Sequence, residues 1–210
     1  PISFPPLTRD KPDRSLSGQF MARTILFICT GNVCRSPMAE GLFRCLIEEN
    51  EADLIVKSAG VGAQDGQPPS GNAIRAMQDL DIDISPQRSL MLTAELAAEA
   101  DMIIGMTHGH VEMVNLMFPH AADKAFLLRE FDDTLPLHER EISDPIGGSY
   151  EVYCQCRDQI REGIDSLLNS IQQNKSLVPT SGQPVIEIAL GADHAGYGLK
   201  KILGNYLGEK

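Results

Sequence analysis

The feature that most constrains the fold is an apolar stretch that runs directly into a short loop and a helix. Residues 24–29 form a continuous apolar run rich in β-forming side chains, which is typical of a central parallel strand buried on both faces. The loop "CTGNVCRS" overlaps its end, and residues 37–49 are expected to be helical, with Ser36 as the N-cap and Pro37 at the first position. Cys29 is therefore predicted to lie at the carboxyl end of a strand, where ligands bind in α/β sheets.

The same alternation of strands and helices continues along the chain. Further strands are expected at residues 54–59, 102–106 and 124–128, and further helices at residues 72–80, 93–100, 111–117 and 150–172. Strands that alternate with helices predict a three-layer α/β fold, in which helices cover both faces of a parallel sheet.

Four segments of different composition divide the chain. Residues 1–22 are polar and proline-rich without periodicity, and they are expected to be a disordered leader. Residues 23–171 contain the α/β domain, residues 172–184 have the composition of a flexible linker, and residues 185–210 hold one further strand and helix. A lone strand and helix cannot bury their own apolar faces, so this last piece is expected to be incomplete.

The charge of the chain argues against several classes of partner. It has 18 basic and 29 acidic residues and a formal net charge of −11, whereas nucleic acids and anionic membranes bind basic surfaces. No apolar run approaches the roughly 18 residues that cross a bilayer, and the N-terminal segment lacks the apolar core of a signal peptide. The 5 cysteines are odd in number and scattered, unlike a disulfide framework. A cytoplasmic protein is expected.

The loop at Cys29 has the composition of an anion-binding site. A loop that wraps tightly before a helix turns successive backbone N–H groups inward, with the positive end of the helix dipole behind them. Arg35 adds a planar guanidinium that can bind two oxygens of a tetrahedral oxyanion, and Ser36 can donate a hydrogen bond to the sulfur. Gly31 is expected to supply the unusual backbone angles of the turn. Together these features predict a thiolate that faces a bound phosphate. The Walker pattern is absent, so the loop is not expected to bind a nucleoside triphosphate.

A reaction at this thiolate needs a proton donor for the leaving group. Asp144 is the best candidate, because Pro145 stiffens its loop and glycines follow; the alternative is an aspartate at a helix N-terminus with only local hydrogen bonds. For Cys29 the alternative is a small buried apolar residue, which free cysteines often are. The coincidence of cysteine, arginine and strand–loop–helix context favours the catalytic interpretation.

Four segments resemble successive blocks of the low-molecular-weight protein tyrosine phosphatases, namely "ILFICTGNVCRSPMAEGLF", "VKSAGVGAQDGQPPSGNA", "ADMIIGMTHGH" and "ISDPIGGSYEVY". The resemblance covers about residues 23–171. It implies a flavodoxin-like fold with a four-stranded parallel sheet, a monomeric domain without metal or organic cofactor, and phosphorylated proteins or peptides as substrates. It also implies that Cys29 becomes phosphocysteine, that Arg35 binds the phosphate, and that Asp144 is the general acid. The implied phosphate-binding loop consists of Thr30, Gly31, Asn32, Val33, Cys34, Arg35 and Ser36.

Several positions depart from the pattern of that family. Members often carry a histidine after the serine of the segment "ISPQRS", where this chain has Pro86 after Ser85, so support for the loop must come from elsewhere or be weaker. Phosphotyrosine enzymes usually place aromatic residues after the Asp-Pro, whereas this chain has Ile146. The segments "DPIGGS", "FPHAADKAFLLREF" and "DGQPPSGNAI" more closely resemble the bacterial phosphoarginine-phosphatase branch. That branch has threonine where phosphotyrosine enzymes have isoleucine, and Val33 at this position leaves both substrates open.

The remaining cysteines and histidines have weaker interpretations. In the family, a second loop cysteine can form a reversible disulfide with the nucleophile, so Cys34 is a candidate redox partner; the alternative is a small buried side chain. His108 and His110 lack further ligands and are interpreted as helix-surface histidines, and Cys154 and Cys156 make a poor metal pair.

The C-terminal stretch "IEIALGADHAGYGLKK" resembles the opening of ribose-5-phosphate isomerase, type B. By that resemblance Asp193 and His194 would belong to a sugar-phosphate site; the alternative is an ordinary turn in which Asp193 caps a helix. The chain ends before the catalytic cysteine of that family. A phosphatase fused to a truncated isomerase piece is therefore expected, with a parent protein that dimerises through the isomerase part and no isomerase activity from this chain.

A cysteine-dependent protein phosphatase is the leading functional hypothesis, with phosphotyrosine as the first substrate class and phosphoarginine as the alternative. Arsenate reductases use the same loop but need a downstream redox cysteine pair, and no cysteine occurs between Cys45 and Cys154. A phosphate-binding module without activity is disfavoured because Cys29, Arg35 and Asp144 occur together. A sugar-phosphate phosphatase is a weaker alternative.

Overall fold

The computed structural model describes residues 23–49 and 54–174. The chain divides into two compact units, residues 1–173 and 174–210, and the fold below is that of the first unit. The predicted leader, the predicted linker from residue 175 on, and the isomerase-like piece with Asp193 and His194 lie outside the described residues.

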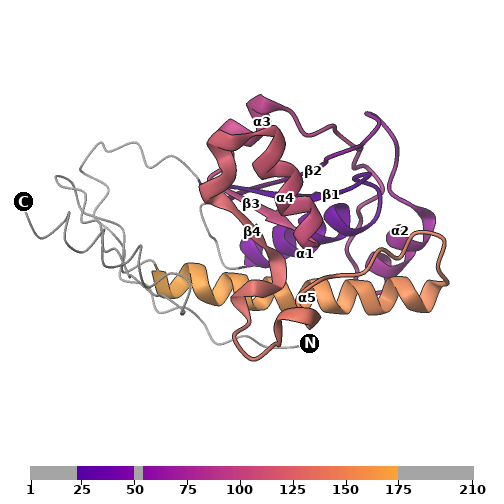
Figure 1. Ribbon diagram of the computed structural model, residues 1–210. Helices are drawn as coiled ribbons and strands as arrows, with labels where there is room; N and C mark the ends of the chain where they lie inside the picture. The colour runs from indigo at the N-terminus through magenta and orange to yellow at the C-terminus, as the bar shows by residue number, and fades with distance from the viewer. Residues whose placement is uncertain (1–22, 50–53, 175–210) are drawn as a thin grey trace, which may run out of the picture. The chain divides into compact units, whose positions relative to one another are not determined.

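The sheet consists of four parallel strands in the order β2-β1-β3-β4, which confirms the predicted sheet (Figure 1). The strands are β1 (Arg23–Cys29), β2 (Leu54–Gly60), β3 (Met102–Gly105) and β4 (Ala125–Leu127). Cys29 pairs with Gly60 of β2, and Ile28 pairs with Gly105 of β3, so three carboxyl ends meet at one edge. Because β2 lies on one side of β1 and β3 on the other, Cys29 sits where the strand order reverses, which is where open α/β sheets bind ligands.

Within residues 23–49 and 54–174, five α-helices and three short 3₁₀-helices accompany the sheet. They are α1 (Arg35–Glu49), α2 (Gly71–Gln78), α3 (Ala94–Glu99), α4 (His108–Met117), η1 (Pro119–Lys124), η2 (Leu128–Phe131), η3 (Leu137–Glu139) and α5 (Tyr150–Asn174). Helix α1 begins at Arg35, so the prediction that Ser36 is its N-cap is wrong; Ser36 lies inside the first turn. Helix α4 begins at His108, earlier than expected, because His110 accepts a hydrogen bond from the backbone of Thr107 and stabilises an extra turn.

The core consists of two apolar clusters, one on each face of the sheet. Side chains of a strand alternate between faces, so Ile25, Phe27 and Cys29 point to the cluster shared with α1 and α5, and Leu26 and Ile28 point to the cluster shared with α3 and α4. Figure 1 shows α3 and α4 together on one side of the sheet and α5 on the other. Burial of each such side chain contributes about 1.5–3 kcal/mol, so β1 is a rigid platform for the loop that follows it.

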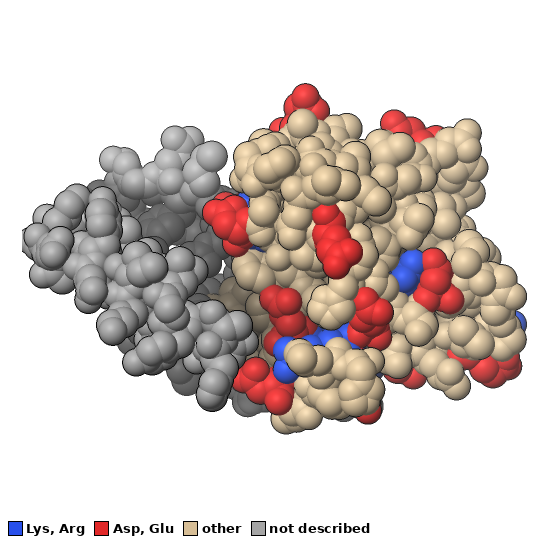
Figure 2. All heavy atoms as spheres, viewed as in Figure 1, with Lys and Arg blue, Asp and Glu red and all other residues tan. Residues whose placement is uncertain are grey.

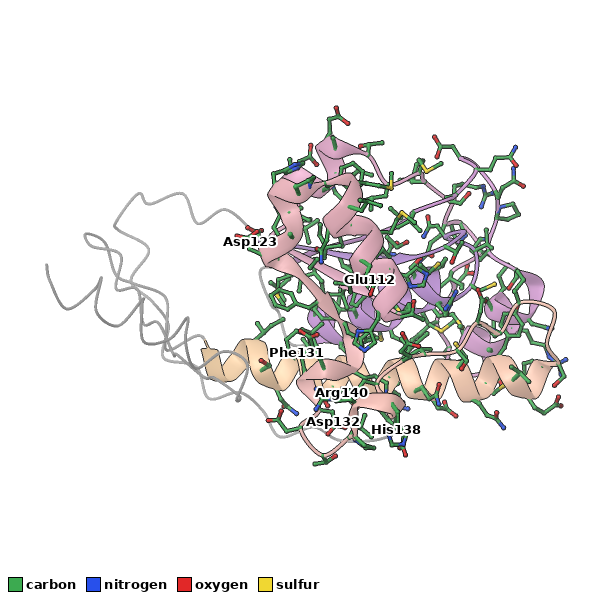
Figure 3. All side chains as sticks on the ribbon, in the orientation of Figure 1. Glu112, Asp123, Phe131, Asp132, His138 and Arg140 are labelled. Carbon is green, nitrogen blue, oxygen red and sulfur yellow. The ribbon has the colours of Figure 1, made fainter. Side chains whose placement is uncertain are left out.

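The connection between β4 and α5, expected to be a polar loop, contains η2 and η3. Figure 3 labels Phe131, Asp132, His138 and Arg140 along it. The buried Arg129 side chain donates to the carbonyl of Glu139 at 2.9 Å, and the Ile142 N–H donates to the carbonyl of Met106 at 2.9 Å. The first bond joins η2 to η3 within the connection, and the second ties the connection to the end of β3. Asp144, which follows Ile142, is thereby held at the sheet edge where β1 ends.

Acidic residues outnumber basic residues in the chain. Figure 2 shows Asp and Glu side chains spread over one face with fewer Lys and Arg, in line with the net charge of −11. Among the helices of residues 23–49 and 54–174, none has the length and apolarity to span a bilayer.

Candidate active site

The thiol of Cys29 lies at the end of β1 with 2% of the residue exposed. The Ser36 hydroxyl oxygen is 3.0 Å from Sγ, and the Asn32 N–H donates to Sγ at 3.3 Å. Both neighbours can donate hydrogen bonds to a sulfur anion, and the start of α1 lies immediately beyond the loop. Hydrogen-bond donors and the positive end of a helix dipole therefore converge on Sγ.

The unusual backbone angles of the loop belong to Asn32, whose φ is 53°. The expectation that Gly31 supplies them is wrong, because Gly31 is not among the residues with positive φ. Asparagine tolerates this left-handed conformation when its side chain is fixed locally. Here the amide nitrogen donates to the hydroxyls of Ser36 and Ser58 at 2.9 Å each, and Oδ1 accepts from the Leu90 N–H at 2.8 Å.

Strand β2 supports the loop through residues that sequence reasoning did not identify. Ser58 donates to the Glu40 carboxylate at 2.5 Å, which extends the network from the loop to α1. Gly60 lies so close that a Cβ there would be 2.5 Å from the Thr30 carbonyl oxygen and 2.9 Å from the Asn32 nitrogen. These contacts supply the support that the segment at Ser85–Pro86 lacks. The small residues of "KSAG" at the end of β2 were the sequence signal from which this close contact with the loop could have been predicted.

Arg35 brings a buried guanidinium to the loop, with 3% of the residue exposed. One terminal nitrogen donates to the Ile142 carbonyl at 3.1 Å, and the other pairs with the Asp144 carboxylate. The buried Nε has no acceptor among the described residues. The Asp144 side chain is 39% exposed, and its other oxygen accepts from the Ile146 N–H at 3.1 Å. A buried guanidinium N–H without an acceptor is costly, and a bound oxyanion would satisfy it.

These side chains surround one pocket of about 200 Å³. Its lining consists of Cys29, Thr30, Gly31, Val33, Cys34, Arg35, Asp144 and Ile146. Cys29 and Arg35 are buried, whereas Thr30 is exposed and Ile146 is 63% exposed, so the thiol and guanidinium form the floor and the latter two the rim. The structure thus brings the predicted nucleophile, phosphate-binding arginine and acid together.

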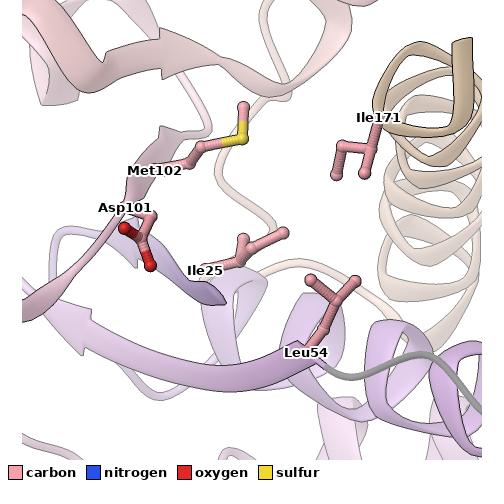
Figure 4. Close-up of a pocket in the computed structure, with 5 residues that line it drawn as sticks. All are labelled: Ile25, Leu54, Asp101, Met102 and Ile171. Carbon is pink, nitrogen blue, oxygen red and sulfur yellow. The ribbon is translucent and has the colours of Figure 1, made fainter. Parts of the chain in front are cut away.

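A second pocket, of about 250 Å³, lies at the amino ends of the strands, away from Cys29 (Figure 4). Its lining is apolar apart from Asp101, and the carboxylate of Asp101 accepts a hydrogen bond from the Thr24 N–H at 2.7 Å. It therefore offers no comparable chemistry.

The second cysteine of the loop, Cys34, is a buried part of the pocket lining. Its Sγ is 3.4 Å from the Ser70 hydroxyl and 3.3 Å from the Tyr153 hydroxyl. Burial raises the pKa of the Cys34 thiol, and these two hydrogen bonds offset part of the increase. No disulfide bond joins the five cysteines, all of which lie among the described residues.

The two histidines of α4 differ in environment. His108 is exposed as expected, but the interpretation of His110 as a surface residue is wrong: it is 5% exposed, and its Nε2 is 3.0 Å from the Thr30 hydroxyl. Burial and, secondly, the Arg35 charge lower the pKa of His110 to about 4. Within the described ranges, no group of three His, Cys, Asp or Glu side chains is arranged to hold a metal ion.

Comparisons with known proteins agree with this geometry. Residues 24–177 match the family model described as low molecular weight phosphotyrosine protein phosphatase. A protein-arginine-phosphatase of Bacillus subtilis is 35% identical over 72% of this chain and 98% of its own length. A structure of the YwlE arginine phosphatase, a mutant with a phosphorylated active-site serine, aligns with a TM-score of 0.68 at 34% identity, over 74% of this chain and 99% of that one.

The tyrosine phosphatase Wzb from Escherichia coli K30, solved in complex with sulphate, aligns with a TM-score of 0.64 at 30% identity. The alignment covers 72% of this chain and 99% of that one. The family match contains every residue that lines the pocket at Cys29.

Proposed function

The chain belongs to the low molecular weight phosphotyrosine protein phosphatase family, and we propose that Cys29, Arg35 and Asp144 carry its reaction. The protein is a cysteine-dependent protein phosphatase. In the first step the Cys29 thiolate attacks the phosphorus of a phosphorylated side chain, and an S–P bond forms as the bond to the leaving group breaks. Asp144 gives its proton to the leaving group. The loop N–H groups and the Arg35 guanidinium bind the remaining phosphoryl oxygens.

In the second step a water molecule attacks the phosphocysteine. The Asp144 carboxylate takes a proton from this water, the S–P bond breaks, and inorganic phosphate leaves while the Cys29 thiolate is restored. Ser36 and the Asn32 N–H stabilise that thiolate as a leaving group, since both lie within hydrogen-bond distance of Sγ.

The ion pair between Arg35 and Asp144 supports these roles, because it places the proposed acid beside the proposed phosphate-binding guanidinium in the pocket. The observation that carries the proposal is the shared pocket of Cys29, Asp144 and a buried Arg35 whose Nε has no acceptor in the part of the chain that the structure describes.

Replacement of the nucleophile tests the first role. Cys29→Ser is expected to abolish phosphate release from an aryl phosphate and to retain binding of inorganic phosphate, measured by calorimetry, because the loop and Arg35 remain. Persistent turnover in this variant would refute the mechanism.

Replacement of Asp144 tests the second role. Asp144→Ala and Asp144→Asn are expected to lower kcat by about 10²–10⁴-fold on substrates with poor leaving groups and much less on activated aryl phosphates. Asp133→Ala, at an exposed residue of the same connection, is the matched control. An equal loss on both kinds of substrate would show that Asp144 is not the acid.

A protein-arginine phosphatase is the second candidate, with the same mechanism. No aromatic side chain belongs to the described lining of the pocket, where Val33 and Ile146 form the apolar walls, and a flat phenol ring gains most from an aromatic wall. The protein-arginine-phosphatase of Bacillus subtilis is also among the relatives with extensive coverage.

Rates on phosphotyrosine and phosphoarginine peptides of otherwise identical sequence discriminate the two substrates. Val33→Thr and Val33→Ile are companion variants. Threonine keeps the size of valine and adds a hydroxyl, whereas isoleucine stays apolar and adds a methylene. A preference for phosphoarginine that increases with threonine and decreases with isoleucine supports the arginine candidate. A preference for phosphotyrosine in all three proteins refutes it.

Two further predictions accompany the function. Cys34 is proposed as a reversible disulfide partner of Cys29, supported by its burial in the same pocket lining. A cytoplasmic location is proposed because no disulfide bond joins the cysteines of the described residues, as is usual in a reducing compartment. The isomerase-like resemblance of residues 185–210 finds no support in the comparisons above, whose family match ends at residue 177.

A further inference from the structure

The hydrogen bonds of His110 determine which of its ring nitrogens carries the proton. The backbone N–H of Thr107 points at Nδ1 from 3.2 Å, and an N–H group can only donate. Nδ1 must therefore be the acceptor, and the proton of the neutral ring resides on Nε2. The Thr107 hydroxyl, 3.0 Å from Nδ1, can donate to the same nitrogen and supports this tautomer.

The proton on Nε2 in turn orients the hydroxyl of Thr30. Nε2 lies 3.0 Å from the Thr30 oxygen, so His110 donates and Thr30 accepts. A threonine hydroxyl has one proton and two lone pairs, and His110 uses a lone pair. Among the described residues His110 is the hydrogen-bond partner of this hydroxyl. The O–H of Thr30 is thus left to donate elsewhere, and Thr30 lines the pocket above Cys29.

His110 is held in this state by its surroundings. Its Cβ lies 3.2 Å from where a Cβ on Gly105 would be, so the absence of a side chain at the end of β3 allows α4 to approach the loop. Burial and the Arg35 charge lower the pKa of His110 to about 4, and the carboxylates of Asp144 and Glu141 offset part of that effect. The ring is therefore neutral at physiological pH, with one donor and one acceptor.

We propose that Thr30 is a substrate-binding residue whose hydroxyl donates a hydrogen bond to the oxyanion bound over Cys29, and that His110 is the positioning residue that orients this hydroxyl. The inference rests on the proposed function, because it places a phosphoryl group in the pocket. The Thr30 hydroxyl would add a side-chain donor to the backbone donors of the loop. Through His110, helix α4 would then influence how the oxyanion is bound.

Removal of the hydroxyl tests the role of Thr30. Thr30→Val keeps the shape of the side chain and is expected to raise the inhibition constant of inorganic phosphate about tenfold, because a hydrogen bond to a charged group is lost. The value of kcat/KM for an aryl phosphate is expected to fall at least as much. Thr30→Ser retains the donor and is expected to stay within about twofold of the wild type. An unchanged phosphate inhibition constant in Thr30→Val overturns the proposal.

Variants of His110 test the positioning role. His110→Leu removes both hydrogen bonds and is expected to weaken phosphate binding, whereas His110→Gln keeps a donor near Nε2 and is expected to restore most of the affinity. His108→Leu, at an exposed position of the same helix, is the matched control and is expected to match the wild type.

The double variant separates positioning from a structural effect. If His110 acts through Thr30, His110→Leu causes no further loss of phosphate affinity in the Thr30→Val background. A loss of equal size in both backgrounds refutes the positioning role, and His110→Gln supplies the same comparison if the leucine variant does not fold. Failure of the proposed function is recognised separately, by turnover that persists in Cys29→Ser.

Discussion

Acid should destabilise this protein through the buried ring of His110. The folded-state pKa of His110 is lowered from 6.5 to about 4, with burial as the main cause. Between these two values the unfolded chain binds a proton that the folded protein does not bind. Stability from this residue is therefore fully present above the unfolded pKa and is lost as pH falls from 6.5 toward 4.

The size of the effect follows from the two pKa values. Linkage of a single group with these values lowers the free energy of unfolding by about 2 kcal/mol between pH 7 and pH 5, and by about 3 kcal/mol once the pH is below both. For a domain with a stability of 5–15 kcal/mol, a loss of about 2 kcal/mol is readily measured.

Urea unfolding followed by circular dichroism at pH 7, 6 and 5 measures this dependence. The informative quantity is the difference in pH dependence between the wild type and His110→Gln, because all other titrating groups are common to both. The wild type is expected to lose about 2 kcal/mol more than the variant between pH 7 and pH 5. His108→Gln, at the exposed histidine of α4, is expected to follow the wild type. Parallel curves for the wild type and His110→Gln would refute the reasoning.

Two substitutions test the support of the loop. Gly60→Ala is expected to lower kcat/KM on an aryl phosphate at least tenfold, because its Cβ would lie 2.5 Å from the Thr30 carbonyl oxygen, while Gly62→Ala, with 3.9 Å to the same atom, serves as the control. Similar rates in both variants would contradict this steric account. Asn32→Ala is expected to lose more stability in urea unfolding than Asn32→Gly, by about 1 kcal/mol, because alanine is strained at a φ of 53° and glycine is not. Equal stabilities would show that the strain is relieved by movement of the loop.

Local signals explain why much of the fold could be predicted. The apolar run of β1 and the Pro37 that follows the loop act within a few residues of each other, so the strand, the loop and α1 are encoded together. The ends of helices and strands were predicted less accurately, because capping depends on hydrogen bonds from side chains at later positions in the chain. Helix α4 begins at His108 since the ring of His110 bonds the backbone of Thr107.

The supports of the loop had no local signal. Whether a histidine on a helix faces solvent or the core depends on what the helix packs against. Helix α4 packs His110 against Gly105 of β3 and against Thr30 in the loop that follows β1. The sequence predicted the unusual backbone angles of the loop at Gly31 rather than at Asn32, because glycine is the residue that most often adopts a left-handed conformation. Hydrogen bonds from Asn32 to Ser58 and from Ser58 to Glu40 stabilise asparagine in this conformation. Ser58 belongs to β2 and Glu40 to α1, so no signal near Asn32 in the sequence indicates them.

The sequence by itself determined the order of strands and helices, and it determined that a cysteine ends a buried strand just before a helix with an arginine at its start. Hydrophobic periodicity and short-range spacing encode such features because they act between neighbours in the chain. Only the tertiary structure decided which groups surround that cysteine. Asp144 meets Arg35 across 109 positions, and His110 meets Thr30 across 80. Such pairs form because parallel strands bring their carboxyl ends to one edge, and the strand order that does so depends on packing of the whole sheet.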